Sequence, residues 1–243
     1  MKELGPSIIK IKTIIKKELS WYFNNPGGFI LIALFIGFGN FLFFRDLFIN
    51  GNATLLPYFQ TVPWLLIFLT AGIAMRSFAE EKRNGTFEVL VSLPLTEWEL
   101  VLGKFFAAFI FVFACFLGSL TLPLTLIFLS KPDLGTLLSG YLGLLLFSAA
   151  LLSIGIFIST LTKNQVVSLL STLLIFFLLI VLGDDLILQQ APQSLTGILS
   201  FLGFSSRVLN FSHGVIDLRD VIFFLTTTFG FIFLSVKITE NRG

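Results

Sequence analysis

Residues 105–130 read FFAAFIFVFACFLGSLTLPLTLIFLS, a run without one charged side chain. About 20 apolar residues are enough to cross the hydrocarbon core of a bilayer as an α-helix. Charged side chains are costly in that core, so a charge-free run of this length is typical of a membrane-spanning helix. The stretch therefore predicts that the protein lies in a membrane.

The composition of the whole chain supports the same class. Of 243 residues, 56% are hydrophobic and 12% are charged, with 31 Phe, whereas soluble domains carry about 25% charged residues. A water-soluble enzyme or binding module of this length could not bury so much apolar side chain. The net charge of +2 also argues against a nucleic-acid-binding protein, whose affinity depends on clustered positive charge.

Further charge-free intervals locate the other crossings. We expect an all-α membrane protein, with 1–243 forming a single transmembrane domain of six helices. The expected spans are about 29–45, 58–78, 99–130, 135–161, 164–183 and 221–237.

Two segments outside these spans have their own patterns. Residues 7–23 alternate Lys with apolar residues and predict an amphipathic helix at the membrane surface. Its expected apolar stripe consists of Ile8, Ile11, Ile15, Leu19 and Tyr22. Residues 184–220 contain apolar patches broken by Gln, Ser and Pro, and predict short re-entrant helices on the outer side before the last span.

The distribution of Lys and Arg gives the orientation, because cytoplasmic loops carry an excess of both. With six spans, twelve of the 16 basic residues fall on the side of the N-terminus. The four on the other side are Arg45, Lys131, Arg207 and Arg219. Both termini are therefore expected in the cytoplasm.

The expected spans lack mid-membrane charged residues and His, the groups on which ion-coupled transporters depend. The chain has one His, His213, and one Cys, Cys115, too few for a metal site on this pattern. Gly103-Lys104 is followed by Phe105, where a phosphate-binding loop needs Ser or Thr. We expect no catalytic, cofactor-binding or metal-ligating residue, so energy for any transport would come from another protein.

The inner loop at 80–95, between the second and third expected spans, holds the densest group of polar residues. Gly85 permits a left-handed or tight turn, and Thr86 could cap a short helix after it. Phe87, Leu90 and Val91 fall on one face of that helix. The pattern predicts a short helix with an apolar face that could dock into a groove of a partner.

Two further signals delimit this helix. Pro94 ends it, because proline cannot continue a helix. Thr96 and Glu99 are spaced as a capping box that starts the third span.

The loop resembles the signature of ABC type-two permeases, the membrane subunits of transporters driven by a separate ATPase. The resemblance lies in MRSFAEEKRNGTFEVL at 75–90, LPLT at 93–96 and LGK at 102–104. Within that family the loop is most similar to the gliding-motility (GldF-like) permeases. Residues 26–29 before the first span and 214–220 before the last agree with it.

This resemblance implies that the loop carries a coupling helix that contacts the ATPase. The residues it assigns to coupling are Glu80, Glu81, Lys82, Arg83, Gly85, Thr86, Phe87, Glu88, Leu90 and Val91, with Phe87, Leu90 and Val91 as the docking face. It implies an ATP-binding subunit that binds the ATP, a second permease subunit, identical or different, and a place in the bacterial cytoplasmic (inner) membrane. The implied function is an exporter-type permease that is not itself an enzyme.

Three alternatives remain open at this point. The short helix could simply close the end of the bundle, with its charges solvated. The chain could anchor an ATPase that transmits force to a cell-envelope machine, with an additional envelope protein as partner. An intramembrane enzyme is disfavoured, because His213 and the pair Glu80 and Glu81 are expected on opposite sides of the membrane.

The orientation can be tested by labelling. We expect Arg83→Cys, in a Cys115→Ala background, to react with an impermeant maleimide in inside-out vesicles and not in right-side-out vesicles. Lys131→Cys is the matched control and should show the reverse pattern. Reaction of Arg83→Cys from the outside would overturn the predicted topology.

Overall fold

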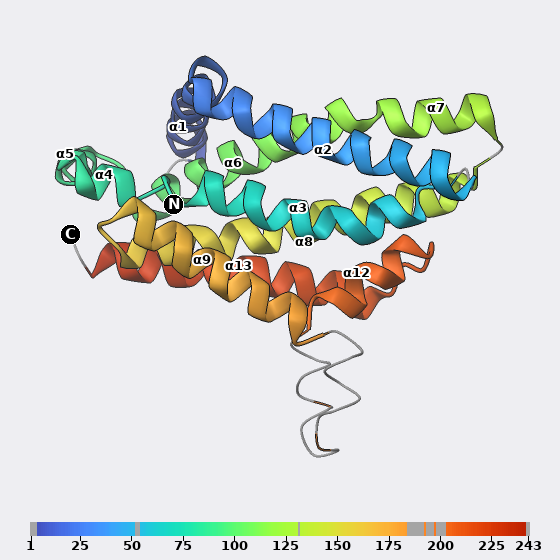
Figure 1. Cartoon of the computed structure of the whole chain (residues 1–243). Helices are drawn as coiled ribbons and strands as arrows, with labels where there is room; N and C mark the ends of the chain where they lie inside the picture. Colours follow the sequence, from blue (N-terminus) through green and yellow to red (C-terminus); the bar gives the residue numbers. More distant parts are fainter. Residues whose placement is uncertain are drawn as a thin grey trace.

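In a computed structural model, the described part of the chain is built from α-helices (Figure 1). The structure describes residues 4–51, 54–130, 132–183, 203–241 and the single positions 192 and 197. The helices are α1 (Leu4–Asn24), α2 (Pro26–Asn50), α3 (Leu56–Ala74), α4 (Ala79–Arg83), α5 (Thr86–Ser92), α6 (Glu97–Ser119), α7 (Thr121–Leu129), α8 (Leu134–Leu161), α9 (Gln165–Val181), α12 (Ser205–Ser212) and α13 (Leu218–Glu240).

Five segments of the described chain are helical, apolar and long enough to cross a membrane. They are Pro26–Ile49, Leu56–Arg83, Glu97–Leu129, Leu134–Leu161 and Leu218–Glu240. The helix α9 is apolar as well but has only 17 residues. The multi-pass class is thus established, while six spans and the cytoplasmic termini stay predictions.

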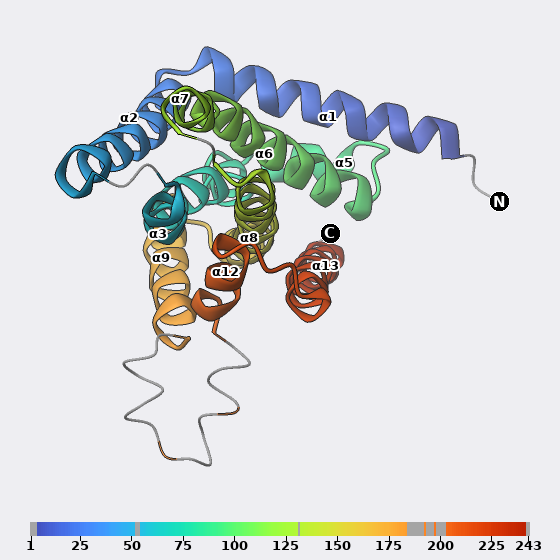
Figure 2. The ribbon, with the colours of Figure 1, turned by 90° about the vertical axis from the view of Figure 1, so that its right-hand side faces the viewer.

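The long helices run side by side in alternating directions, and α1 crosses one end of this bundle (Figures 1 and 2). The short helices α4 and α5 and the end of α13 lie at the same end as α1. We call it the α5 end. The helices α7 and α12 lie toward the opposite end (Figure 1).

The turn between α1 and α2 is tight. It consists of Asn25, whose side chain accepts a hydrogen bond from the backbone N–H of Gly27 at 3.0 Å. A Cβ atom at Gly28 would overlap the Tyr22 carbonyl, so only glycine fits there. As a result α2 begins at Pro26, ahead of the expected start at 29, and continues to Asn50.

The third expected span, 99–130, is broken at Leu120. The helix α6 ends at Ser119, and α7 starts again at Thr121. Pro123 lacks the N–H that would bond to the Ser119 carbonyl, which is a common cause of such breaks. The carbonyl instead accepts from the Tyr141 hydroxyl of α8 at 3.2 Å.

The helix α8 contacts several neighbours closely through its glycines. A Cβ atom at Gly140 would lie 2.5 Å from the Phe59 ring of α3, and one at Gly155 would lie 2.5 Å from Cβ of Ala74. Gly143 faces Phe211 of α12 in the same way. Small residues let membrane helices approach until their backbones nearly touch, so α8 holds α3 and α12 at close range.

Much of the expected outer region, 184–220, lies outside the described residues. Gly183 and Gly203, on either side of residues 184–202, pack against each other. Beyond them, α12 is fixed to α13 by Asp220, which accepts from Arg207 at 2.6 Å and from Asn210 at 2.8 Å. Re-entrant helices before the last span therefore stay a prediction.

The glycine contacts predict the effect of one added methyl group. Gly155→Ala should lower the free energy of unfolding by about 1–3 kcal/mol, because the site is already filled. Gly230→Ala in α13 is the control, since no atom lies within 4 Å of its added Cβ. Thermal unfolding in detergent should separate the two variants, and equal stabilities would contradict the close packing of α8 on α3.

Candidate functional site

The α4–α5 segment forms a two-helix projection at the α5 end of the bundle (Figure 1). Gly85 joins α4 to α5 in the left-handed conformation, with φ of 71°. The capping box is present: the backbone N–H of Thr96 donates to Glu99 at 2.8 Å, and that of Glu99 donates to the Thr96 hydroxyl at 3.3 Å. The left-handed turn and the start of α6 are thus confirmed.

One of the expected details differs. The N-cap of α5 is Gly85, and the Thr86 hydroxyl does not cap the helix; it donates to the carbonyl of Glu81 at 3.3 Å. The α5 helix ends at Ser92, and Leu93 is extended, as expected for the residue before Pro94. Glu88 and Arg83 are exposed on the outside of the projection.

The apolar face expected to dock onto a partner is turned toward the protein itself. The Phe87 side chain is buried and meets the Phe78 ring edge-on, with centroids 6.3 Å apart. Leu90 is half-buried, and Val91 packs against the same core. The periodicity identified a real apolar face, but this face packs on the bundle because Phe78 lies directly beneath it.

The opposite face of α5 is the one that solvent or a partner can reach. Val89 is 62% exposed, and Leu93, directly after the helix, is 45% exposed. We call Val89 and Leu93, with the neighbouring exposed Glu88 and Ser92, the outer face of α5. Sequence periodicity alone did not single it out.

The first connection between the projection and the bundle runs to α8. The Ser159 hydroxyl accepts from the backbone N–H groups of Phe78 and Ala79, both at 3.0 Å, where α4 begins. Lys82 donates to the Thr160 carbonyl at the end of α8. These bonds satisfy terminal backbone groups of two helices at once and fix α4 against α8.

The second connection is a buried ion cluster. The Lys104 ammonium of α6 contacts Glu81 Oε1 of α4 at 2.7 Å and Glu18 Oε1 of α1 at 3.1 Å. The Lys104 side chain is 3% exposed. Sequence reasoning assigned Glu81 to coupling but missed Lys104 as its partner. It also missed Glu18 as the second acid that pairs with Lys104, since 86 residues separate these two.

The crosswise helix α1 is held against the same end by other contacts. The Arg76 guanidinium lies over the Trp21 ring, and Arg76 also pairs with Glu80 at 2.6 Å. Lys10 donates to the Pro94 carbonyl at 2.6 Å. These contacts tie α1 to the turns on both sides of the projection.

The buried face of α1 includes most of the expected stripe, since Ile11, Ile15 and Leu19 are half-buried. Ile8 is exposed, whereas Ile14 is buried against Gly103 of α6, where an added Cβ would lie 2.7 Å from Ile14 Cγ2. Tyr22 is buried as expected. Its burial raises the pKa of the hydroxyl, and the negative charge of Glu18 raises it further. The contact with α6 therefore decides which side of α1 faces inward.

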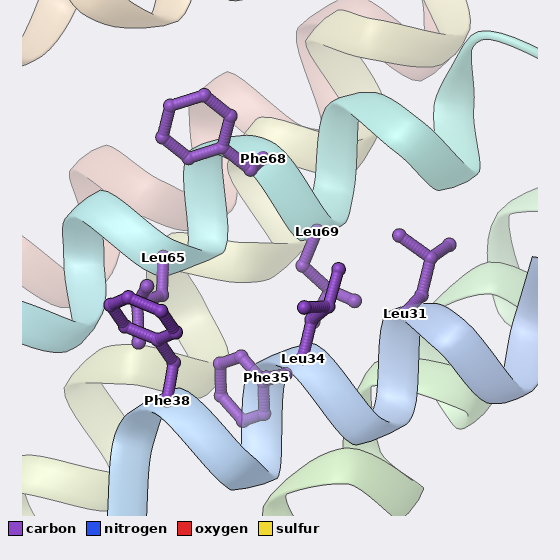
Figure 3. Close-up of a pocket in the computed structure, with 7 residues that line it drawn as sticks. All are labelled: Leu31, Leu34, Phe35, Phe38, Leu65, Phe68 and Leu69. Carbon is purple, nitrogen blue, oxygen red and sulfur yellow. The ribbon is translucent and has the colours of Figure 1, made fainter. Parts of the chain in front are cut away.

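A groove between α2 and α3 is the most apolar hollow among those described (Figure 3). Leu65 and Leu69 of α3 project toward Leu34, Phe35 and Phe38 of α2. Its lining consists of apolar side chains: Leu31, Leu34, Phe35, Phe38, Leu65, Phe68 and Leu69. Without polar groups to fix an orientation, such a groove suits hydrocarbon chains.

Within the described ranges, no three His, Cys, Asp or Glu side chains are placed to share a metal ion. The ionic groups of the α5 end are instead paired across helices, as in the Lys104 cluster. These ion pairs connect the helices at the α5 end to one another.

The protein is a multi-pass bundle of helices with a short helical projection that is bonded to several of them. This architecture places it in the class of membrane subunits. Residues 51–206 match the family described as ABC-2 family transporter protein. Because this match covers more than half of the chain, the chain belongs to that family and is a permease component of an ABC transporter. No curated protein matches the chain.

The connection to α8 gives a prediction. Ser159→Ala leaves the buried N–H groups of Phe78 and Ala79 without their acceptor and should cost about 1–3 kcal/mol. Hydrogen exchange at residues 76–84 should accelerate in this variant. Ser153→Ala is the matched control, because among the described residues that buried α8 hydroxyl donates within its own helix, to the Ala150 carbonyl. Equal exchange in both variants would contradict the anchoring role of Ser159.

Proposed function

We propose that the protein is the membrane half of an exporter-type ABC transporter and that the α4–α5 projection couples it to a separate ATP-binding subunit. One observation carries the proposal: a short helix with exposed apolar residues is held rigidly at one end of the bundle. Val89 and Leu93 are exposed there, while Phe87, on the other side of the same helix, is buried. An exposed apolar pair on an anchored helix suits docking into a groove of a partner.

Two such subunits, identical or different, would enclose the transport pathway in the bacterial inner membrane. ATP binding would close the ATPase and move the projections, shifting each permease between inward-facing and outward-facing states. The permease performs no chemistry in this scheme. Its projection biases a two-state equilibrium through contacts that differ between the two states. The ATP stays on the partner subunit.

The coupling role is assigned to the charged and apolar residues of the projection, with one revision. Glu80, Glu81, Lys82, Arg83, Gly85, Thr86 and Glu88 keep the roles that the resemblance implies. Phe87, Leu90 and Val91 pass the movement inward, and Val89 and Leu93 take over the docking contact. The apolar lining of the groove in Figure 3 favours a hydrophobic or amphipathic substrate.

The alternative is a subunit that anchors an ATPase and transmits force to an envelope machine. The resemblance to gliding-motility permeases favours it. Both functions need the same docking contact, so reconstitution with the ATPase must separate them. ATP turnover without movement of any solute from a broad panel of lipids and amphiphiles would favour the anchor.

The docking contact can be tested directly. We expect Val89→Asp to abolish co-purification of the ATP-binding subunit in mild detergent, because a carboxylate would enter the apolar contact, while membrane insertion and thermal stability are kept. Val215→Asp is the matched control: this valine is 56% exposed but lies toward the opposite end of the bundle. Unchanged co-purification with Val89→Asp would refute the docking assignment.

A further inference from the structure

Lys104 is the one described side chain at the α5 end whose charged atom contacts acidic groups of two other helices at once. Its ammonium lies 2.7 Å from Glu81 of α4 and 3.1 Å from Glu18 of α1. It also lies 5.2 Å from the centre of the Phe78 ring, just before α4 begins. One buried atom of α6 thus meets both α1 and the first residues of α4.

The cluster depends on this single ammonium. Glu81 Oε2 is buried and makes no hydrogen bond within the described residues. Among the residues that the structure describes, the second cation that pairs with Glu81 is Lys17, whose ammonium lies 3.9 Å from Glu81 Oε1 and whose side chain is 63% exposed. Without Lys104, the two carboxylates would face each other in a partly buried site with little compensation.

The surroundings of Lys104 leave little freedom to adjust. The preceding residue, Gly103, lies against Ile14 of α1 so closely that an added Cβ would come within 2.7 Å of it. On the other side, Ser159 and Lys82 hold α4 to α8. A displacement of α4 therefore reaches α1 and α6 through the charged groups.

We propose that Lys104 is a positioning residue that makes α4, α1 and α6 move as one body, so that a push on the projection is delivered to α1 and α6 as well as to α3 and α8. The proposal rests on the coupling function proposed above and names the residue through which the movement of the projection is transmitted. Buried ion pairs are best attested as devices that fix one arrangement. Here that arrangement is the position of the projection relative to α1.

The experiment measures the distance between spin labels at Asn84→Cys, directly after α4, and Lys12→Cys on α1, in a Cys115→Ala background. Both label sites are exposed. The permease is studied with its ATP-binding subunit in nanodiscs, without nucleotide and trapped with ATP and vanadate. With Lys104 present, we expect one narrow distance distribution that is the same in both states.

With Lys104→Met, which keeps the length and apolar stem, we expect a broader distribution and a nucleotide-dependent shift of at least about 2 Å, the scale of helix shifts in switching proteins. Lys104→Arg should restore the narrow distribution. Lys17→Met is the matched control, because it removes the exposed lysine near the same Glu81 oxygen, and it should behave like the unsubstituted protein.

The outcomes separate this proposal from the proposed function. If Lys104→Met lowers thermal stability but leaves the distances and their response to nucleotide unchanged, the residue is merely structural and the proposal fails. If no ATP-binding subunit co-purifies with any variant, the proposed function fails instead. The isolated permease then still tests the positioning role of Lys104. A distance distribution of equal width with and without Lys104 would overturn this role, and a broader distribution without Lys104 would support it.

Discussion

Close packing around α8 is the constraint on which the arrangement of the other helices depends. Apolar helices gain nothing from leaving lipid for one another, so their association rests on van der Waals contact at short range. Gly140 and Gly155 bring the two ends of α3 against α8 through Phe59 and Ala74. Because α3 is held at both ends, the segment that follows it emerges from the bundle at a fixed place.

The polar contacts at the α5 end build on this fixed position. Ser159 accepts two backbone N–H groups where α4 begins, and Lys104 joins Glu81 to Glu18. Each contact connects segments far apart in the sequence, so each can form only after the helices have assembled. Their burial also makes them specific, since an unpaired charge or N–H group in the same place would be costly. The projection is therefore an extension of the bundle and not a loose loop between two helices.

Much of this architecture is determined by residues that are close together in the sequence, so it could be predicted from the sequence. Charge-free runs indicate membrane helices because the cost of a charge in hydrocarbon does not depend on the fold. The capping box of Thr96 and Glu99 and the left-handed Gly85 follow from neighbouring residues alone, and both are confirmed. The break of α6 at Leu120 could also have been predicted from Pro123. It was missed because the spans were located from the positions of charged residues.

The parts that could not be predicted depend on contacts between distant segments. Periodicity shows that Phe87, Leu90 and Val91 share a face, yet it cannot tell whether a partner or Phe78 covers that face. The inward position of Phe87 has a mechanical consequence: α5 presses through Phe87 on the Phe78 ring, and that ring lies 5.2 Å from the Lys104 ammonium. In the proposed coupling, a force on the outer face of α5 would therefore reach the core beside Lys104, the residue proposed to join α4, α1 and α6. An outward-facing Phe87 would add apolar area to the proposed docking surface, but α5 would lose this contact with the bundle.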